Sequence, residues 1–214
     1  DYKVKAKVGN PQVTYRESVT TSHEHREVFE KVIGGKENRA ELLIRVFPQE
    51  RGAGNHFESS VPVAKLPKTF ADACERGIQA AFSSGIRLGY PGIDIGVELV
   101  DAVYDEQTAS PFAFEAAASL GFDNACAGAA PVLLEPVMKI DVLVPKEFMG
   151  DAINGITTRG GIVHSVESRP NTEHITAEAP LRKMFGYSTA LRSTTQGRGN
   201  YAMEFSHFAP SDGR

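Results

Sequence analysis

The C-terminal part of the chain alternates between strand-like and helix-like hydrophobic patterns. MKIDVLV and YAMEFSHF place apolar residues at every second position, as half-buried strands do. EFMGDAINGITTRG instead spaces its apolar residues so that they share one face of a helix. In order, strands and helices are predicted at residues 137–144 (strand), 145–158 (helix), 161–168 (strand), 174–179 (strand), 181–193 (helix) and 201–208 (strand). This βαββαβ order predicts a ferredoxin-like domain.

The earlier part of the chain is less regular but contains two clear helical patterns, at residues 67–85 and 110–128. Ser110 followed by Pro111 is typical of an N-cap and first helical position, which fixes where the second helix starts. Strands are predicted at residues 13–21, 39–48 and 94–104. These elements predict an α+β layer in which strands are backed by two helices.

A change of pattern in GAAPVLLEP, residues 128–136, separates the two parts. Here an Ala-rich helix ends in Gly and Pro, and a new strand pattern begins. We therefore predict two domains, residues 1–133 and 134–214, in an α+β fold. The acidic excess lies in the first domain, which has 14 basic and 18 acidic residues against 9 of each in the second.

Composition and charge argue against a membrane protein, a secreted protein and a general nucleic-acid binder. The chain has no run near the roughly 20 apolar residues that a membrane-spanning helix needs, and its charged start does not resemble a secretion signal. A cytoplasmic protein without a membrane partner is predicted. The net charge of −4 argues against a general polyanion binder, because non-specific affinity for nucleic acid depends on Lys and Arg. Any RNA contact should therefore be local.

The sequence contains no recognisable catalytic or nucleotide-binding motif. GxxxxGK[ST], GxGxxG, GxSxG and HExxH do not occur. The nearest Gly-rich segments, IGGKEN at 33–38 and QGRGN at 196–200, are predicted to be turns, with phosphate binding as the less favoured alternative. We expect no catalytic centre and no cofactor in this chain.

Two pairs of side chains are the candidate metal ligands of the sequence. His23 and His25 have strand spacing and would share one face, as metal ligands can. No third ligand is implied, so a solvated strand end is favoured. Cys74 and Cys126 lie in Ala-rich helical segments without a CxxC pair, which predicts reduced buried thiols rather than a disulfide or a metal site.

Three polar, Gly-containing loops are predicted in the first domain, at residues 34–39, 85–92 and 100–110. The first and third could meet at one end of the domain, and surface loops commonly carry recognition. The sequence therefore predicts a rigid protruding tip.

Several long segments resemble translation elongation factor G, in the same order as in that family. KVGNPQVTYRES (7–18) and GYPGIDIGVELVDAVYDE (89–106) resemble parts of its domain IV. PVLLEPVMKIDVLVPKEFMGDAINGITTRGGIV (131–163) and PLRKMFGYSTALRSTTQGRGNYAMEFSHF (180–208) resemble most of its domain V. The matches run over nearly the whole chain and are too long and ordered to arise by chance.

The resemblance implies a left-handed βαβ first domain, as in certain small-subunit ribosomal proteins, before the ferredoxin-like domain. It implies that a GTPase domain, which holds GTP and Mg²⁺, a β-barrel and another small domain precede residue 1 in the natural protein. In the family, GTP hydrolysis accompanies movement of tRNA and mRNA, while domain IV reaches the decoding site and domain V lies against the large subunit. The implied partners are rRNA and proteins of both ribosomal subunits, tRNA and mRNA, bound by a monomer.

The resemblance also assigns candidate contact residues. In the two tip loops these are Gly34, Gly35, Lys36, Asn38 and Arg39, and Tyr104, Asp105, Glu106 and Gln107. On the large-subunit side they are Arg159, Gly160 and Gly161, with Arg198 as a further candidate because guanidinium groups bind phosphate bidentately. A solvated surface role is the open alternative for the three arginines, and a turn is the favoured alternative for the two glycines Gly160 and Gly161.

The sequence departs from the family pattern at the tip. Where the family reads like GGRGQYGH, this chain reads GGKENRAE at 34–41, and Asp105 stands where many members have histidine. The added carboxylates of Glu37, Asp105 and Glu106 repel RNA phosphates within a Debye length of about 8 Å, so weaker RNA affinity is expected.

Four alternatives remain open from the sequence. Local pairing of Glu37 with Lys36 or Arg39 would leave the tip's function intact. The natural protein could be a paralogue specialised for ribosome recycling or another translation step. The chain could also be a stand-alone RNA- or protein-binding module, or an enzyme, although fold alone does not support the last.

Overall fold

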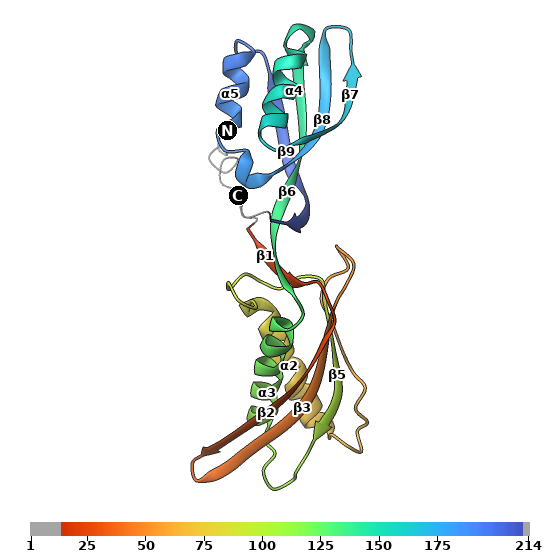
Figure 1. The fold of residues 1–214 in the computed structure, drawn as a ribbon, viewed down its shortest axis with the longest axis vertical. Helices are drawn as coiled ribbons and strands as arrows, with labels where there is room; N and C mark the ends of the chain where they lie inside the picture. The colour runs from red at the N-terminus through yellow and green to blue at the C-terminus, as the bar shows by residue number, and fades with distance from the viewer. Residues whose placement is uncertain (1–13, 212–214) are drawn as a thin grey trace. The chain divides into compact units, whose positions relative to one another are not determined.

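The structure, a computed structural model, describes residues 14–211 (Figure 1). These residues form two compact units that divide between Leu134 and Glu135. Thr14 groups with the second unit, whereas the predicted boundary at residue 133 assigned it to the first domain. Each unit combines helices with a sheet around its own hydrophobic core, which confirms the predicted α+β class.

A four-stranded sheet backed by two helices forms the first unit (Figure 1). Its strand order is β2-β3-β5-β4, with bounds His23–Ile33, Lys36–Pro48, Ile95–Val103 and His56–Ser59. The first three strands are antiparallel, but β4 runs parallel to β5. Helix α2 (Lys68–Ser84) connects these parallel strands, which makes β4-α2-β5 a βαβ unit. Helix α3 (Pro111–Ala127) follows β5 and packs on α2 and on the sheet.

Buried and partly exposed residues alternate strictly along β3 from Asn38 to Phe47, so one face of the sheet packs against the helices. Leu42, Ile44 and Val46 point toward the helices and are at most 1% exposed. The residues between them, including Arg45, lie on the opposite face. The two helices approach closely at Gly77, where an added Cβ would lie 2.3 Å from the carbonyl oxygen of Glu115. Glycine is therefore required at this helix crossing.

The predicted strands of the first unit need correction. The strand predicted at 13–21 is only β1 (Arg16–Val19), which pairs with residues 131–134. Strands β2 and β4 were not predicted. The sequence of β2, HEHREVFEKVI, carries polar residues on both faces because this strand lies at the edge of its sheet. An edge strand of this kind lacks the alternation of apolar and polar residues that identifies a strand.

The second unit has the predicted βαββαβ order. Its strands are β6 (Pro131–Pro145), β7 (Ile162–Ser168), β8 (Thr172–Pro180) and β9 (Asn200–Pro210). Of β6, only the residues from Glu135 onward belong to this unit. The helices are α4 (Met149–Thr158) and α5 (Tyr187–Thr194). In the sheet, β6 lies between β9 and β8, and β7 forms the edge beyond β8. This is the ferredoxin-like arrangement, and both helices lie on one face of the sheet (Figure 1).

Both helices of the second unit are shorter than predicted and begin with a separate 3₁₀ turn. These turns are η1 (Lys146–Phe148) and η2 (Leu181–Lys183). Gly186 has a φ of 80°, a left-handed conformation that interrupts the helix predicted at 181–193. Residues 184–186 therefore form a short connection that buries Met184 and exposes Phe185, and α5 starts only at Tyr187.

Candidate functional site

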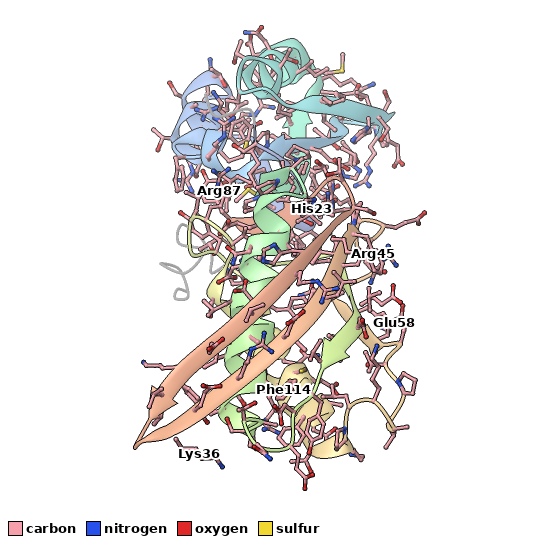
Figure 2. The ribbon with its side chains drawn as sticks, turned by 60° about the horizontal axis from the view of Figure 1, so that its bottom comes forward. His23, Lys36, Arg45, Glu58, Arg87 and Phe114 are labelled. Carbon is pink, nitrogen blue, oxygen red and sulfur yellow. The ribbon has the colours of Figure 1, made fainter. Side chains whose placement is uncertain are left out.

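The β2–β3 hairpin forms one part of the predicted tip. Gly34 and Gly35 make its turn, with φ values of 59° and 78°. Positive φ at both central residues is the geometry of a tight hairpin turn, and glycine adopts it without strain. The predicted loop at 34–39 is therefore too long, because Lys36, Asn38 and Arg39 already belong to β3. Lys36 lies at the end of the hairpin (Figure 2).

The loop after β5 meets the start of β3, as predicted for the tip. The backbone N–H of Arg39 donates to the carbonyl oxygen of Thr108 at 2.9 Å. Asp105 closes the loop, since its side chain accepts from the N–H of Gln107 at 2.9 Å and its carbonyl oxygen accepts from the N–H of Thr108 at 3.1 Å. The loop spans residues 104–110 rather than 100–110, because β5 continues to Val103.

The candidate side chains at the tip differ in exposure. Tyr104 packs on the Phe70 ring, with centroids 5.1 Å apart, and belongs to the edge of the core. Asn38 is 8% exposed and its amide donates to the carbonyl oxygen of Lys36 at 3.0 Å. The exposed candidate side chains are Lys36, Asp105, Glu106 and Gln107. Together with the exposed Glu37, they give the tip three carboxylates and one lysine.

Arg39 is engaged by neighbouring carboxylates. Its guanidinium donates to Glu41 at 3.1 Å and to Glu30 at 3.3 Å, rather than to Glu37 as one alternative expected. The hydrogen bond to Glu41 raises the pKa of Arg39, and the same bond lowers the pKa of Glu41. An RNA phosphate at this position would have to compete with both carboxylates.

The sheet face that carries Arg39 bears further ion pairs. Arg26 lies 2.8 Å from Glu41, and Arg45 lies 2.9 Å from Glu98. Arg45 and Glu58 extend from this face in Figure 2. A hydrogen bond from Ser60, with a smaller contribution from Arg45, lowers the pKa of Glu98. The arginines on this face are thus already paired with carboxylates.

The loop predicted at 85–92 is organised by a buried carboxylate. Glu17 is 2% exposed, and its carboxylate accepts hydrogen bonds from four backbone N–H groups at 2.8 to 3.3 Å. The donors are Ile86, Arg87, Leu88 and Tyr90. The side chains of Arg87 and Leu88 stay exposed beside a depression of about 450 Å³, whose other lining residues are Glu17 and 131–133.

In the second unit, Arg159 holds the backbone of a neighbouring connection. Its Nη1 donates to the carbonyl oxygens of Lys183 at 2.8 Å and of Phe185 at 2.9 Å. The guanidinium also lies over the Tyr187 ring, 5.5 Å from its centroid. These contacts occupy the side chain that the resemblance implied as an RNA contact.

The other candidates of the second unit are also placed by local contacts. Gly160 has a φ of 77°, and Gly161 donates its N–H to Ile156 at 2.9 Å, so both residues form the turn that ends α4. An added Cβ at Gly161 would lie 2.5 Å from Ile156 Cγ2. Arg198 pairs with Glu147 at 2.9 Å, and both side chains are exposed.

The histidines and cysteines do not converge on a metal site. His25 lies 3.0 Å from Glu27, and His23 packs against Gly128 at the end of α3. Within residues 14–211, no group of three or more His, Cys, Asp or Glu side chains could hold a metal ion. Cys74 and Cys126 are free and buried, and burial raises the pKa of Cys74 to about 12.

Sequence reasoning missed the roles of two acidic residues, Glu17 and Asp123. Asp123, on α3, has a buried Oδ1 without a hydrogen-bond partner. Burial raises the pKa of Asp123, and repulsion from Glu17 adds to this effect. No motif marks either residue, because their environments depend on segments far apart in the chain.

Of the helices in the described residues, none has the length and apolar character needed to cross a membrane.

Comparison with known proteins matches both units. Residues 11–130 match the family described as Elongation factor G, domain IV, and residues 132–214 match Elongation factor G C-terminus. The chain is 54% identical to elongation factor G 1 of Treponema denticola and 42% identical to elongation factor G 2 of Treponema pallidum. Each alignment covers 97% of this chain and 32% of the relative, so the chain spans about a third of their length.

A solved structure supports the fold of both units. The crystal structure of a Thermus thermophilus protein superposes with a TM-score of 0.85 at 32% sequence identity, and the match covers 95% of this chain and 30% of that protein. The sequence matches therefore extend to the fold. On these findings, the chain belongs to the elongation factor G family and comprises its domain IV followed by its C-terminal domain.

Proposed function

We propose that the chain is the ribosome-docking part of a cytoplasmic translational GTPase that moves tRNA and mRNA through the ribosome. The observation that supports this most directly is the tip of the first unit. There the Gly34–Gly35 turn lies at the end of a long hairpin, and the 104–110 loop is tied to β3 by the bond between Arg39 and Thr108. A narrow, hydrogen-bonded projection of this kind suits insertion at the decoding site.

The chain contributes binding rather than catalysis in this proposal. GTP and Mg²⁺ would be held by a domain that precedes this chain in the longer protein, as the length of its relatives suggests. The second unit would dock on the large subunit while the tip reaches the small subunit. The partners would be rRNA, ribosomal proteins, tRNA and mRNA, engaged by a single copy of the protein.

Toeprinting tests the proposed translocation. Pre-translocation ribosomes are incubated with the longer protein and GTP, and the position of the ribosome on the mRNA is read by primer extension. A shift of one codon is expected. An unchanged toeprint, together with ribosome-stimulated GTP hydrolysis, would contradict a role in translocation.

A second function, in ribosome recycling or another translation step, is favoured by the acidic tip. Asp105, Glu106 and Glu37 are exposed there and would repel the phosphates of tRNA and mRNA. Light scattering distinguishes the two functions, because a recycling paralogue would split ribosomes in the presence of the recycling factor and GTP. A translocase would instead shift the toeprint, and replacing Glu37 and Glu106 with Gln should accelerate that shift.

A further inference from the structure

The second unit has opposite charge on its two layers. The segments 146–160 and 181–199, which hold the helices, contain two acidic residues, Glu147 and Asp151, and six basic residues: Lys146, Arg159, Arg182, Lys183, Arg192 and Arg198. The strand segments 135–145, 162–180 and 200–210 contain two basic residues, Lys139 and Arg169, and six acidic residues: Glu135, Asp141, Glu167, Glu173, Glu178 and Glu204. The helix layer is therefore the side of this unit that attracts a polyanion.

An exposed aromatic side chain projects from the helix layer. Phe185 is 66% exposed, more than any other large hydrophobic side chain described in this unit. Its neighbours Met184 and Tyr187 are 4% and 2% exposed. The chain thus buries a side chain on either side of Phe185 and leaves the phenyl ring in water, where it has no role in the core.

The backbone beneath Phe185 is fixed. Arg159 donates to the carbonyl oxygens of Lys183 and Phe185, and stacks over the ring of Tyr187. Gly186, at a φ of 80°, turns the chain into α5 directly after the exposed ring. An exposed ring on a fixed connection loses little conformational entropy on binding, which favours its use as an anchor.

We propose that Phe185 stacks on an unpaired base of ribosomal RNA, and that Arg159 acts as the positioning residue that holds it there. The inference rests on the proposed docking of the chain on the ribosome and names one contact of it. Its chemistry is that of single-stranded RNA recognition, in which an aromatic face stacks on a base while nearby cations meet the phosphates. Lys183, two residues from Phe185, is exposed and available for the second role.

The charge of the layer favours RNA over an apolar protein pocket as the partner. Lys146, Lys183 and Arg192 are exposed on the same helix layer, and a protein pocket for Phe185 would gain nothing from them. A phosphate backbone releases counterions when such side chains approach it. An apolar protein pocket is therefore the competing outcome that the experiment has to exclude.

The chain contains no tryptophan, so a single Phe185→Trp substitution introduces a unique fluorophore. Incorporated as 5-hydroxytryptophan, it can be excited beyond the absorption of the tryptophans in ribosomal proteins. The matched control is Ile162→Trp, because Ile162 is 65% exposed and lies in the strand layer of the same unit. Each variant of the 214-residue chain is mixed with purified large ribosomal subunits, and co-sedimentation reports whether it binds.

Stacking on a base should quench the fluorophore at position 185 and leave the one at position 162 unchanged. Co-sedimentation without quenching at 185 would overturn the stacking contact and leave the proposed function standing. A blue shift without quenching would also overturn it, since it would place the ring in an apolar protein pocket. If the unsubstituted chain fails to co-sediment, the proposed docking is wrong and this inference falls with it.

A double-mutant cycle tests the positioning role of Arg159. Phe185→Ala should weaken binding between about fivefold and a hundredfold, the loss typical of one stacked base. Arg159→Ala should weaken binding of the parent chain but add little in the Phe185→Ala background. Lys183→Ala is the control, because the loss of a phosphate contact should remain nearly the same in both backgrounds. If Arg159→Ala, like Lys183→Ala, weakens binding by the same factor in the parent chain and in the Phe185→Ala background, Arg159 does not act through Phe185.

Discussion

The carboxylate of Glu17 is tolerated in the interior because the backbone solvates it. Removing a charge from water is costly unless hydrogen bonds replace the lost hydration. Four N–H groups from the loop after α2 supply those bonds. A carboxylate offers acceptors to all four, whereas a glutamine amide would offer one oxygen and turn an NH₂ group toward the remaining donors.

We expect Glu17→Gln to destabilise the first unit by about 2 kcal/mol, the cost of leaving buried donors unpaired. Urea denaturation measures the change. Glu58→Gln is the control, since the Glu58 side chain is 54% exposed on β4 and its loss should change the free energy of unfolding by less than about 0.5 kcal/mol. Similar effects of the two substitutions would mean that the amide donors of the loop do not depend on the carboxylate.

Asp123 presents the opposite case, a carboxylate that the fold does not satisfy. Burial raises its pKa and Glu17 adds repulsion, so the folded-state pKa exceeds the unfolded value. The ionised carboxylate therefore lowers the stability at neutral pH. This cost disappears when the carboxyl is protonated in both states, below its unfolded pKa of about 3.9.

Asp123→Asn should raise the Tm at pH 7, and this advantage should shrink as the pH falls through the folded pKa of Asp123. Calorimetric scans of both proteins from pH 7 to about pH 3 measure the change. Asp72→Asn serves as control, because the Asp72 side chain is 48% exposed and forms an ion pair with Lys68 at 2.9 Å. A gain of the same size at every pH would show that the amide improves packing and that the charge has no part in the effect.

At the scale of single elements, the backbone strain at the turn of the β2–β3 hairpin can be measured without any steric contribution from neighbouring residues. A Cβ at Gly35 would meet nothing within 4 Å, so any cost of Gly35→Ala arises from its φ of 78°. We expect a loss of about 1 kcal/mol, because L-residues are strained in the left-handed region. Urea denaturation of the first unit measures it.

Gly150 is the matched control for this substitution. It also has open space around its Cβ position, but it lies inside α4 without a positive φ. Gly150→Ala should therefore stabilise the second unit by roughly 0.5 kcal/mol, since alanine loses less entropy than glycine in a helix. Opposite signs are expected for the two substitutions. Destabilisation by both would contradict this prediction, because it would show that the added methyl group clashes at each site instead of finding open space.

The sequence predicted the elements that bury one face and expose the other. Strands β6 and β8 alternate buried and more exposed residues along most of their length, and the apolar stripes of α4 and α5 fit between them, so the order of the ferredoxin-like unit was predicted in full. The start of α3 was also correct, because Ser110 Oγ accepts from the N–H of Ala113 at 3.1 Å. Hydrophobic periodicity suffices for such elements, since burial on one face determines the pattern.

The errors lie where backbone pairing, not burial, determines structure. The segment after Gly35 reads as a loop, because KENR is polar and only Asn38 turns inward. It is a strand because it pairs with β2, itself an edge strand without an apolar pattern. Similarly, Arg159 was predicted to be a surface contact, and its hydrogen bonds to residues 183 and 185 depend on chain folding that spacing does not encode.

At the scale of the whole molecule, the two hydrophobic cores share no residue within positions 14–211. The core of the first unit contains both cysteines of the chain, Cys74 and Cys126, and that of the second contains none. Each thiol is buried, and burial raises the pKa of each, so neither reacts in the folded state. The rate of thiol labelling therefore reports opening of the first unit alone.

Leu42→Ala and Ile156→Ala remove equally buried side chains from the two cores, and each should cost about 3 kcal/mol in its own unit. If the cores unfold independently, Leu42→Ala should accelerate thiol labelling in the absence of denaturant roughly a hundredfold, since labelling follows the open population. Ile156→Ala should leave that rate unchanged while lowering the unfolding midpoint of the second unit. Acceleration by both variants would mean that the strand β6, which contributes residues to both units, couples them into one cooperative structure.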